Sequence, residues 1–224
     1  MVKKKSFGIL EAEKNKTSLK ALLFINGEPP KRLPIASGFD VVACSDGAFL
    51  YLRAKGFPLE QLDFISGDFD SFSDLEAIPK EKIILTPNQD ETDFHKALTI
   101  LKEKGIRKVE VYGGSGGEMD HFLGNLSVAY RFWEVMEITF HDEYAQYFFI
   151  PKGFKIKGVK GKISSLYPFP MATNIETKGL NWCLNGETLS ITDRIGTRNF
   201  ATEDEVEISY ENGAMLLFLG GQYK

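Results

Sequence analysis

The sequence has few of the residues that zinc sites and disulfide scaffolds require. Only 2 cysteines and 3 histidines occur in 224 residues. They are Cys44, Cys183, His95, His121 and His141. Two cysteines cannot form a disulfide framework, and these side chains do not stand at the close spacing that zinc ligands need. We therefore expect neither a zinc site nor a disulfide-rich fold.

Long apolar runs are missing as well. The longest, such as 214–219, are far short of the roughly 20 residues that cross a bilayer. The N-terminal MVKKKSFGIL lacks the sustained apolar stretch of a secretory signal. A net charge of −4 leaves no basic excess for neutralising nucleic-acid phosphates. We therefore expect a cytoplasmic protein that binds neither membranes nor nucleic acid.

Four short loops, rich in acidic residues or glycine, each follow an apolar run that is typical of a buried strand. They are CSDGA at Cys44–Ala48, SGDFDS at Ser66–Ser71, PNQDETDFHKA at Pro87–Ala97 and GGSGGEMDHFLGN at Gly113–Asn125. In open α/β sheets, ligands bind beyond the carboxyl ends of the strands, so these loops are predicted to meet at one edge. Carboxylates gathered without arginine partners repel one another, and a bound divalent cation relieves that repulsion. Oxygen-only ligands favour magnesium.

The first part of the chain alternates apolar β-rich runs with helical patterns. Strands are predicted at 21–25, 41–44, 64–66, 83–85 and 109–112, and helices at 49–55, 93–104 and 119–136. This rhythm predicts an α/β domain over 1–142 with a mostly parallel sheet covered on both sides.

After about residue 140 the pattern changes to short strand-like pieces separated by glycine, proline and asparagine. They lie at 154–156, 162–166, 189–192, 206–209 and 215–219. Asn185–Gly186 and Asn212–Gly213 have the composition of tight hairpin turns, whose central residues need positive φ. We expect a smaller all-β sandwich domain over 143–224.

Several carboxylates in the loops have a structural alternative beside the functional one. Asp68 and Asp70 are two residues apart, so in an extended segment both point to the same side and could share a metal. The alternative is a capped turn, and Asp46 could likewise be only a helix cap.

Asp90, Glu91 and Asp93 precede a predicted helix, where a carboxylate is favoured by the free amides and the dipole of the first turn. Their number exceeds what capping needs. Lys96 follows one turn after Asp93, from where it could reach a phosphate or form an i,i+3 pair with Asp93.

The loop Gly113–Gly117 opens a predicted helix, an arrangement in which bare amides approach a phosphate. Gly114 and Gly116 are candidate contacts of this kind. The spacing matches neither the P-loop nor the dinucleotide fingerprint. His121 follows in the helix, and for this histidine alone a structural role is the leading alternative.

Together and in this order, the four motifs resemble the thiamine pyrophosphokinase family. The later segments SLYPF at Ser165–Phe169 and GLNW at Gly179–Trp182 look like that family's second domain. The resemblance implies an α/β domain joined to a β-sandwich and a homodimer with the cleft between subunits. It also implies transfer of a pyrophosphoryl group from magnesium-bound ATP to the hydroxyl of thiamine, with release of AMP.

The resemblance also implies roles by position. The magnesium-binding and catalytic acids would be Asp68, Asp70 and Asp93, with Asp120 completing the catalytic set. The ATP cleft would further contain Asp46, Gln89, Asp90, Thr92 and His121. The thiamine-binding residues of the β-domain would be Asn199, which matches a family position, and Trp182, the candidate aromatic for the flat thiamine cation. For Trp182, packing in the core is the alternative.

Two positions depart from the family pattern. The glycine loop of the family usually reads GGRxDH, and Glu118 stands here at the arginine position. A family Ser-Asn pair corresponds to Arg198-Asn199. The paired changes motivate the hypothesis that Arg198 replaces the lost positive charge.

Three other functions are compatible with these motifs. The same acids could activate water in a magnesium-dependent phosphatase of nucleotides or metabolites. Glu118 is also compatible with a non-catalytic sensor of nucleotide or thiamine diphosphate. A related diphosphokinase could act on a different alcohol, since acceptor choice depends on the shape of the pocket.

Overall fold

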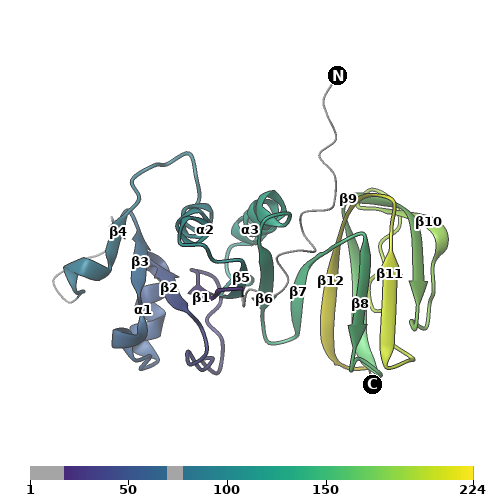
Figure 1. Cartoon of the computed structure of the whole chain (residues 1–224), viewed down its shortest axis with the longest axis horizontal. Coiled ribbons are helices and arrows are strands. Elements are labelled where there is room, and N and C mark those ends of the chain that lie inside the picture. The colour runs from purple at the N-terminus through teal and green to yellow at the C-terminus, as the bar shows by residue number, and fades with distance from the viewer. Residues whose placement is uncertain (1–17, 70–77, 224) are drawn as a thin grey trace.

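A computed structural model describes residues 18–69 and 78–223. Its strands form one continuous hydrogen-bonded sheet in the order β4-β3-β2-β1-β5-β6-β7-β12-β9-β11-β8, with β10 beside β9. Figure 1 shows helices α1, α2 and α3 beside the N-terminal strands of this sheet, whereas its C-terminal part consists of strands and their connections. The prediction of an α/β fold is confirmed at this level.

The N-terminal strands pair in parallel. They are β1 (Lys20–Phe24), β2 (Val41–Ser45), β3 (Phe64–Gly67), β4 (Ile83–Leu85), β5 (Lys108–Tyr112) and β6 (Glu137–His141). The helices are α1 (Asp46–Ala54), α2 (Asp93–Glu103) and α3 (Met119–Phe132), with short 3-10 helices at Leu59–Gln61 and Lys80–Lys82. All five predicted strands and three helices are present. However, the first helix begins at Asp46 rather than 49, the third ends at Phe132 rather than 136, and β6 was not predicted.

Alternation along the strands divides the core between the two faces of the sheet, because successive side chains point to opposite faces. Ala21 and Leu23 of β1 belong to a buried cluster with residues of α2 and α3. Leu22 and Phe24 belong to a second cluster with α1. Figure 1 shows α2 and α3 on one side of the strands and α1 on the other.

The expected cover on both faces is complete only for part of the sheet. Within the described residues, the cluster on the α1 face contains no residue of β6. Instead, β5 and β6 place Glu110 and His141 on this face, where both are partly exposed. This face of β5 and β6 is therefore polar.

The C-terminal strands are all antiparallel. They are β7 (Ala145–Ile150), β8 (Gly153–Lys157), β9 (Lys162–Lys178), β10 (Asn185–Ser190), β11 (Glu205–Ser209) and β12 (Asn212–Gln222). Strand β7 pairs with β6 and so joins this part to the parallel strands. These strands bury a cluster of their own, formed by residues from Ile150 onward.

The prediction of tight hairpin turns at the two Asn-Gly pairs is wrong. Asn185–Gly186 begins β10 and Asn212–Gly213 begins β12, each at a register shift against β9. Gly213 has a φ of 87°, and a Cβ there would collide with the carbonyl of Met171. The positive φ therefore serves an irregularity inside the strand pair rather than a two-residue loop.

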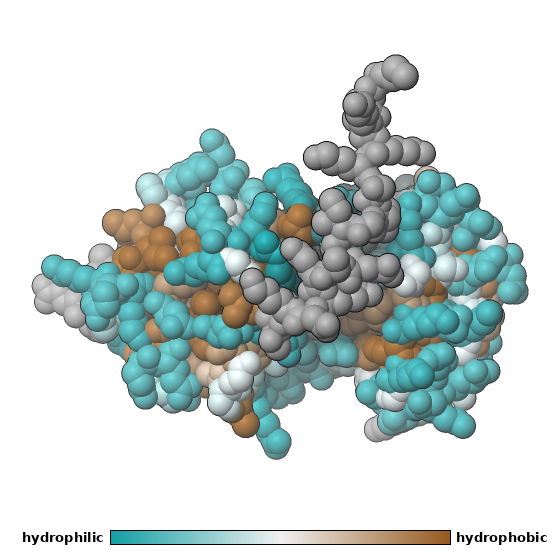
Figure 2. Space-filling view, viewed as in Figure 1, coloured by the Kyte–Doolittle hydropathy of each residue, from teal (hydrophilic) through white to brown (hydrophobic). Residues whose placement is uncertain are grey.

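The outside of the molecule is mainly hydrophilic on the face shown in Figure 2, with apolar residues in separate patches. In the described ranges, none of the helices has the length and apolar character needed to span a membrane.

Candidate functional site

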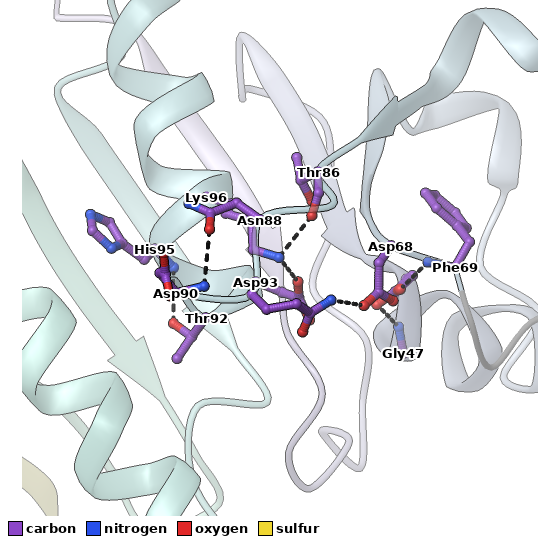
Figure 3. Close-up of polar contacts among 12 residues, drawn as sticks. Gly47, Asp68, Phe69, Thr86, Asn88, Asp90, Thr92, Asp93, His95 and Lys96 are labelled. Atoms are coloured by element: carbon purple, nitrogen blue, oxygen red, sulfur yellow. Dashed lines mark hydrogen bonds and ion pairs between the residues drawn. The ribbon is translucent and has the colours of Figure 1, made fainter.

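The parallel strands bring the predicted loops to one edge of the sheet. Asp46 directly follows β2, Asp68 follows β3, and residues 86–92 connect β4 to α2. These strands are neighbours, and the glycine loop follows β5 on the other side of β1. Figure 3 shows Asp68, Asp93 and the residues between them at this edge.

Asp46 is held by two backbone amides, one in the first turn of α1 and one in the segment after β3. Its Oδ1 accepts a hydrogen bond from Gly47 N at 2.6 Å, and its Oδ2 accepts one from Phe69 N at 3.0 Å. A Cβ on Gly67 would collide with the Asp46 carboxylate, so only glycine allows this close approach of β3. The carboxylate thus links the ends of β2 and β3.

The pKa of Asp46 depends on its burial, on its hydrogen bonds and on the charges of the neighbouring acids. Burial raises the pKa of Asp46, the amides of Phe69 and Gly47 lower it, and the charges of Asp93 and Asp68 raise it further. Three carboxylates therefore interact at this edge, which the sequence motifs predicted.

The loop after β4 supplies a hydrogen bond to this group. Gln89 Nε2 donates to Asp68 Oδ2 at 2.9 Å. Within the loop, Asp90 N donates to Asn88 Oδ1 at 3.0 Å. Gln89 is therefore placed beside a predicted catalytic acid, while the contact of Asp90 shapes the loop.

Helix α2 begins with a capped first turn that carries Asp93. Thr92 is the N-cap, and its Oγ1 accepts a hydrogen bond from His95 N at 3.2 Å. Lys96 is 7% exposed, and its Nζ lies 2.9 Å from Asp93 Oδ1 and 2.9 Å from the Thr86 carbonyl. The i,i+3 ion pair, the alternative to a phosphate contact, is thus formed in this structure.

Buried hydroxyls extend the set of oxygen atoms at this edge. Ser45 and Ser66 are paired in the register of β2 and β3, and among residues 18–69 and 78–223 their hydroxyls and that of Thr86 find no hydrogen-bond partner. Such groups are usually satisfied by water or a ligand. Carboxylates and hydroxyls without nitrogen or sulfur ligands fit magnesium in chemical type.

A complete metal-binding geometry is not formed by the described side chains alone. In residues 18–69 and 78–223, no group of three or more His, Cys, Asp or Glu side chains is arranged to hold a metal ion. Asp70 lies outside the described residues. Asp46, Asp68 and Asp93 are the described carboxylates that could contribute.

The glycine loop packs against a loop that sequence reasoning missed. Residues Asn26–Glu28 follow β1, and Glu28 N donates to the Ser115 carbonyl at 2.9 Å. A Cβ on Gly27 would collide with the Gly113 carbonyl, and one on Gly114 would collide with the ring of Phe140. The sequence feature that could have indicated this loop is the Asn26-Gly27 pair directly after the apolar run 21–25, because the four predicted loops also follow apolar runs.

The first residues of α3 are more exposed to solvent than Asp46, Asp68 and Asp93. Asp120 and His121 are exposed, and Asp120 Oδ1 accepts a hydrogen bond from His121 N at 3.0 Å. His121 Nε2 lies 3.6 Å from the Glu118 carboxylate. These contacts of Asp120 and His121 lie within their own helix turn.

The candidate thiamine residues form a local unit in the C-terminal part. Trp182 is 52% exposed, so packing in the core does not explain it, and its ring meets Phe200 edge-on at 5.7 Å. Asn199 is buried, accepts from Trp182 N at 3.1 Å and Phe200 N at 2.9 Å, and donates to the Trp182 carbonyl at 2.8 Å. The Asn199 side chain therefore positions the backbone of Trp182.

Arg198 lies next to this unit and is exposed. It has a φ of 61°, and its guanidinium is 5.9 Å from the centre of the Tyr223 ring. Its backbone N donates to Ser165 Oγ at 2.9 Å. Replacement of the charge lost at Glu118 by Arg198 remains a hypothesis.

Comparison with known families gives matches in both parts of the chain. Residues 35–140 match the family model described as thiamin pyrophosphokinase, catalytic domain, and residues 150–215 match thiamin pyrophosphokinase, vitamin B1 binding domain.

Individual relatives agree with these matches. The chain is 29% identical over 171 residues to thiamine pyrophosphokinase 1 of Oryza sativa subsp. japonica, covering 67% of this chain and 63% of the relative. It is 28% identical over 123 residues to thiamine pyrophosphokinase of Bacillus subtilis, covering 50% and 56%. The matched regions thus span less than two thirds of the length of these relatives.

Solved structures show the same fold at lower sequence identity. The crystal structure of yeast thiamin pyrophosphokinase superposes with a TM-score of 0.80 at 19% identity, covering 93% of this chain and 88% of the other. A thiamin pyrophosphokinase family protein from Enterococcus faecalis gives 0.77 at 22% identity, covering 91% and 100%.

The ion pair between the buried Lys96 ammonium and the partly exposed Asp93 carboxylate predicts energetic coupling between the two residues. Asp93→Asn leaves a buried ammonium without its partner, so Lys96→Met should cost less stability in that background than in the wild type. We expect a coupling of about 1 kcal/mol in the free energy of unfolding, measured by urea denaturation of both single variants and the double variant. Lys102→Met, at an exposed lysine of the same helix, is the control and should show no coupling. Additive effects of Lys96→Met and Asp93→Asn would contradict the assignment.

Proposed function

Since the chain belongs to the thiamin pyrophosphokinase family, we propose that it transfers a pyrophosphoryl group from magnesium-bound ATP to the hydroxyl of thiamine. The products are thiamine diphosphate and AMP. The observation that carries this proposal is the interaction of Asp46, Asp68 and Asp93 at one sheet edge. Transfer of this kind depends mainly on positioning and charge neutralisation, which clustered carboxylates with a bound cation provide.

Asp68, Asp70 and Asp93 are proposed to hold the magnesium ion. When bound, the ion neutralises the charge of the triphosphate and orients it. The proposal is supported by the all-oxygen character of this edge and by Gln89, which holds the Asp68 carboxylate at 2.9 Å. Asp46 acts beside them by fixing the loops after β2 and β3.

The remaining ATP contacts are proposed from Asp90, Thr92, the amides at Gly114 and Gly116, and His121, with Asp120 as a further catalytic acid. Glycine without Cβ lets a phosphate approach the backbone amides of the loop. Lys96 contributes through Asp93 rather than by direct contact, because its ammonium is buried in an ion pair.

Thiamine is proposed to bind against Trp182. An exposed indole presents a face to a flat cation, and such contacts favour tryptophan over other aromatic residues. Asn199 is assigned to hold the Trp182 backbone in place, which is supported by its two hydrogen bonds with the amide and the carbonyl of Trp182.

We also propose the wider organisation that the family resemblance implies. The two units are residues 1–142 and a β-sandwich over 143–224, which agrees with the family-model matches at 35–140 and 150–215. The protein forms a homodimer with the cleft between subunits. A cytoplasmic location is supported by free cysteines at positions 44 and 183.

The proposed reaction is tested by following nucleotide and thiamine products together. The purified protein is incubated with magnesium and ATP, with and without thiamine, and AMP, ADP and thiamine diphosphate are separated by chromatography. We expect AMP and thiamine diphosphate in equal amounts, and only when thiamine is present.

Each alternative gives a different product pattern. Phosphate release without thiamine would identify a phosphatase, and saturable binding without any product would identify a sensor. AMP formation with another alcohol in place of thiamine would identify a diphosphokinase of different acceptor specificity. Any of these results would overturn the proposed reaction.

Asp68→Asn should lower kcat by about 100-fold or more, because it removes a charge that holds the cation while conserving side-chain volume. Steady-state kinetics at saturating ATP and thiamine measure the loss, and circular dichroism checks the fold. Asp193→Asn, at an exposed aspartate in the connection after β10, is the matched control. Full activity in a folded Asp68→Asn protein would refute the assignment.

Trp182→Ala should raise the KM for thiamine about tenfold and leave the KM for ATP unchanged, because the indole contributes a cation–π contact of about 1.4 kcal/mol. A second readout comes from a Trp133→Phe background, in which Trp182 is the remaining tryptophan of the two. Thiamine should quench its fluorescence. An unchanged thiamine KM together with no quenching would place thiamine elsewhere.

A further inference from the structure

Strands β5 and β6 end in a stacked pair of rings that none of the proposed roles uses. Tyr112 and His141 lie opposite each other in the register, with ring centroids 4.9 Å apart and an interplanar angle of 11°. The Glu110 carboxylate forms a hydrogen bond with His141 Nε2. The His141 imidazole is therefore held on its face by the Tyr112 ring and at its Nε2 edge by the Glu110 carboxylate.

A cavity of about 460 Å³ lies beside this pair. It is lined by Pro30, Lys31, Arg32, Tyr112, His141, Asp142 and Glu143. Its volume falls within the range of about 300–1,000 Å³ that is typical of small-molecule sites. The cavity is thus large enough for a ring system of the size of a nucleobase.

The cavity is connected to the glycine loop. Tyr112 directly precedes Gly113, and Ser115 Oγ is within hydrogen-bond distance of Asp142 Oδ2 at 3.3 Å. The loop after β1, which supplies the other wall, contacts the same serine through Glu28 N at 2.9 Å. A ligand in the cavity therefore lies next to the amides proposed to bind phosphates.

Most charges around the cavity already have partners. Lys31 Nζ lies 3.3 Å from Glu143 Oε2, and the Lys31 amide donates to the same carboxylate at 2.9 Å. Asp142 Oδ1 accepts hydrogen bonds from the amides at 144 and 145, at 2.7 and 2.8 Å. Arg32 forms no ion pair within the part of the chain that the structure describes. The walls therefore offer little net charge.

Tyr112 adds a hydroxyl group to this lining. Burial raises the pKa of Tyr112, and the neighbouring Glu110 charge raises it further, so the hydroxyl stays protonated at neutral pH. The cavity thus combines an aromatic ring, a hydroxyl donor and one guanidinium. This combination suits a flat, uncharged ring with polar edges better than it suits an isolated anion.

We propose that this cavity receives the purine base of the nucleotide substrate, stacked on His141. The inference rests on the proposed function, since it assigns the base of ATP to a subsite beside the phosphate loop. Tyr112 and Glu110 are positioning residues that hold the imidazole, and Arg32 lies at the rim of the cavity.

The test separates the base from the phosphates by using a ligand without a base. Binding of ATP and of inorganic tripolyphosphate is measured by isothermal titration calorimetry for the wild type, His141→Ala and His141→Phe. Stacking on a base is worth about 1–3 kcal/mol, so His141→Ala should weaken ATP binding about tenfold. Tripolyphosphate binding should be unchanged, and His141→Phe should retain most of the ATP affinity because it keeps a ring.

Tyr144→Ala provides the matched control. Tyr144 is 86% exposed on the same turn but does not line this cavity, so its removal should leave both affinities unchanged. Thermal unfolding of each variant confirms that it is folded.

The outcomes distinguish this proposal from the proposed function. Equal ATP affinity in the wild type and His141→Ala would overturn the base subsite while leaving the reaction intact. Equal weakening of ATP and tripolyphosphate would also overturn it, because His141 would then act on the phosphates or on the loop. A wild type that binds neither ligand would refute ATP as the substrate and the base subsite with it.

Discussion

The carboxylates at the carboxyl end of the parallel strands are costly to bring together, and the surrounding amides and the Lys96 ammonium are placed where they offset this cost. Burial raises the pKa of Asp46, and the charges of Asp93 and Asp68 raise it further. Backbone amides of Gly47 and Phe69 offset part of this cost. The Lys96 ammonium offsets another part through Asp93. These groups come from three segments, at the start of α1, after β3 and at the start of α2, so the acids can gather only when the strands are in register.

The same constraint explains why small residues line this edge. Gly67 lets β3 pass the Asp46 carboxylate, and Gly47 leaves room for the side chain of Asn26. Gly27 and Gly113 approach each other closely between the ends of β1 and β5. A side chain at these glycines would push the loops apart and separate the groups that they carry. The glycines therefore serve the geometry of the site as much as the turns themselves.

Local patterns were sufficient for the elements of the α/β part. The apolar run 21–25 and the helical spacing in 93–104 depend on neighbours in the sequence, and both elements formed within one residue of the predicted bounds. The C-terminal part was harder to predict because long antiparallel strands depend on distant partners. The 17-residue strand β9 pairs with β10, β11 and β12, whereas its sequence predicted only 162–166 as a strand. Both Asn-Gly pairs lie at irregularities in the pairing with β9 rather than in hairpin turns, and this pairing cannot be read from the local sequence.

From local chemistry alone, the chain specifies the loops that carry acids and glycines and the order of most N-terminal elements. The type of residue, its spacing and the preceding apolar run are enough for these predictions. Contacts between loops required the tertiary structure. The burial of Lys96 against Asp93 and Thr86, the use of Asn199 to hold Trp182, and the stacking of His141 on Tyr112 all join groups through the folded backbone. Sequence spacing allows an i,i+3 pair or a stacked ring, but packing determines which of these contacts forms, because only packing determines which groups lose access to water.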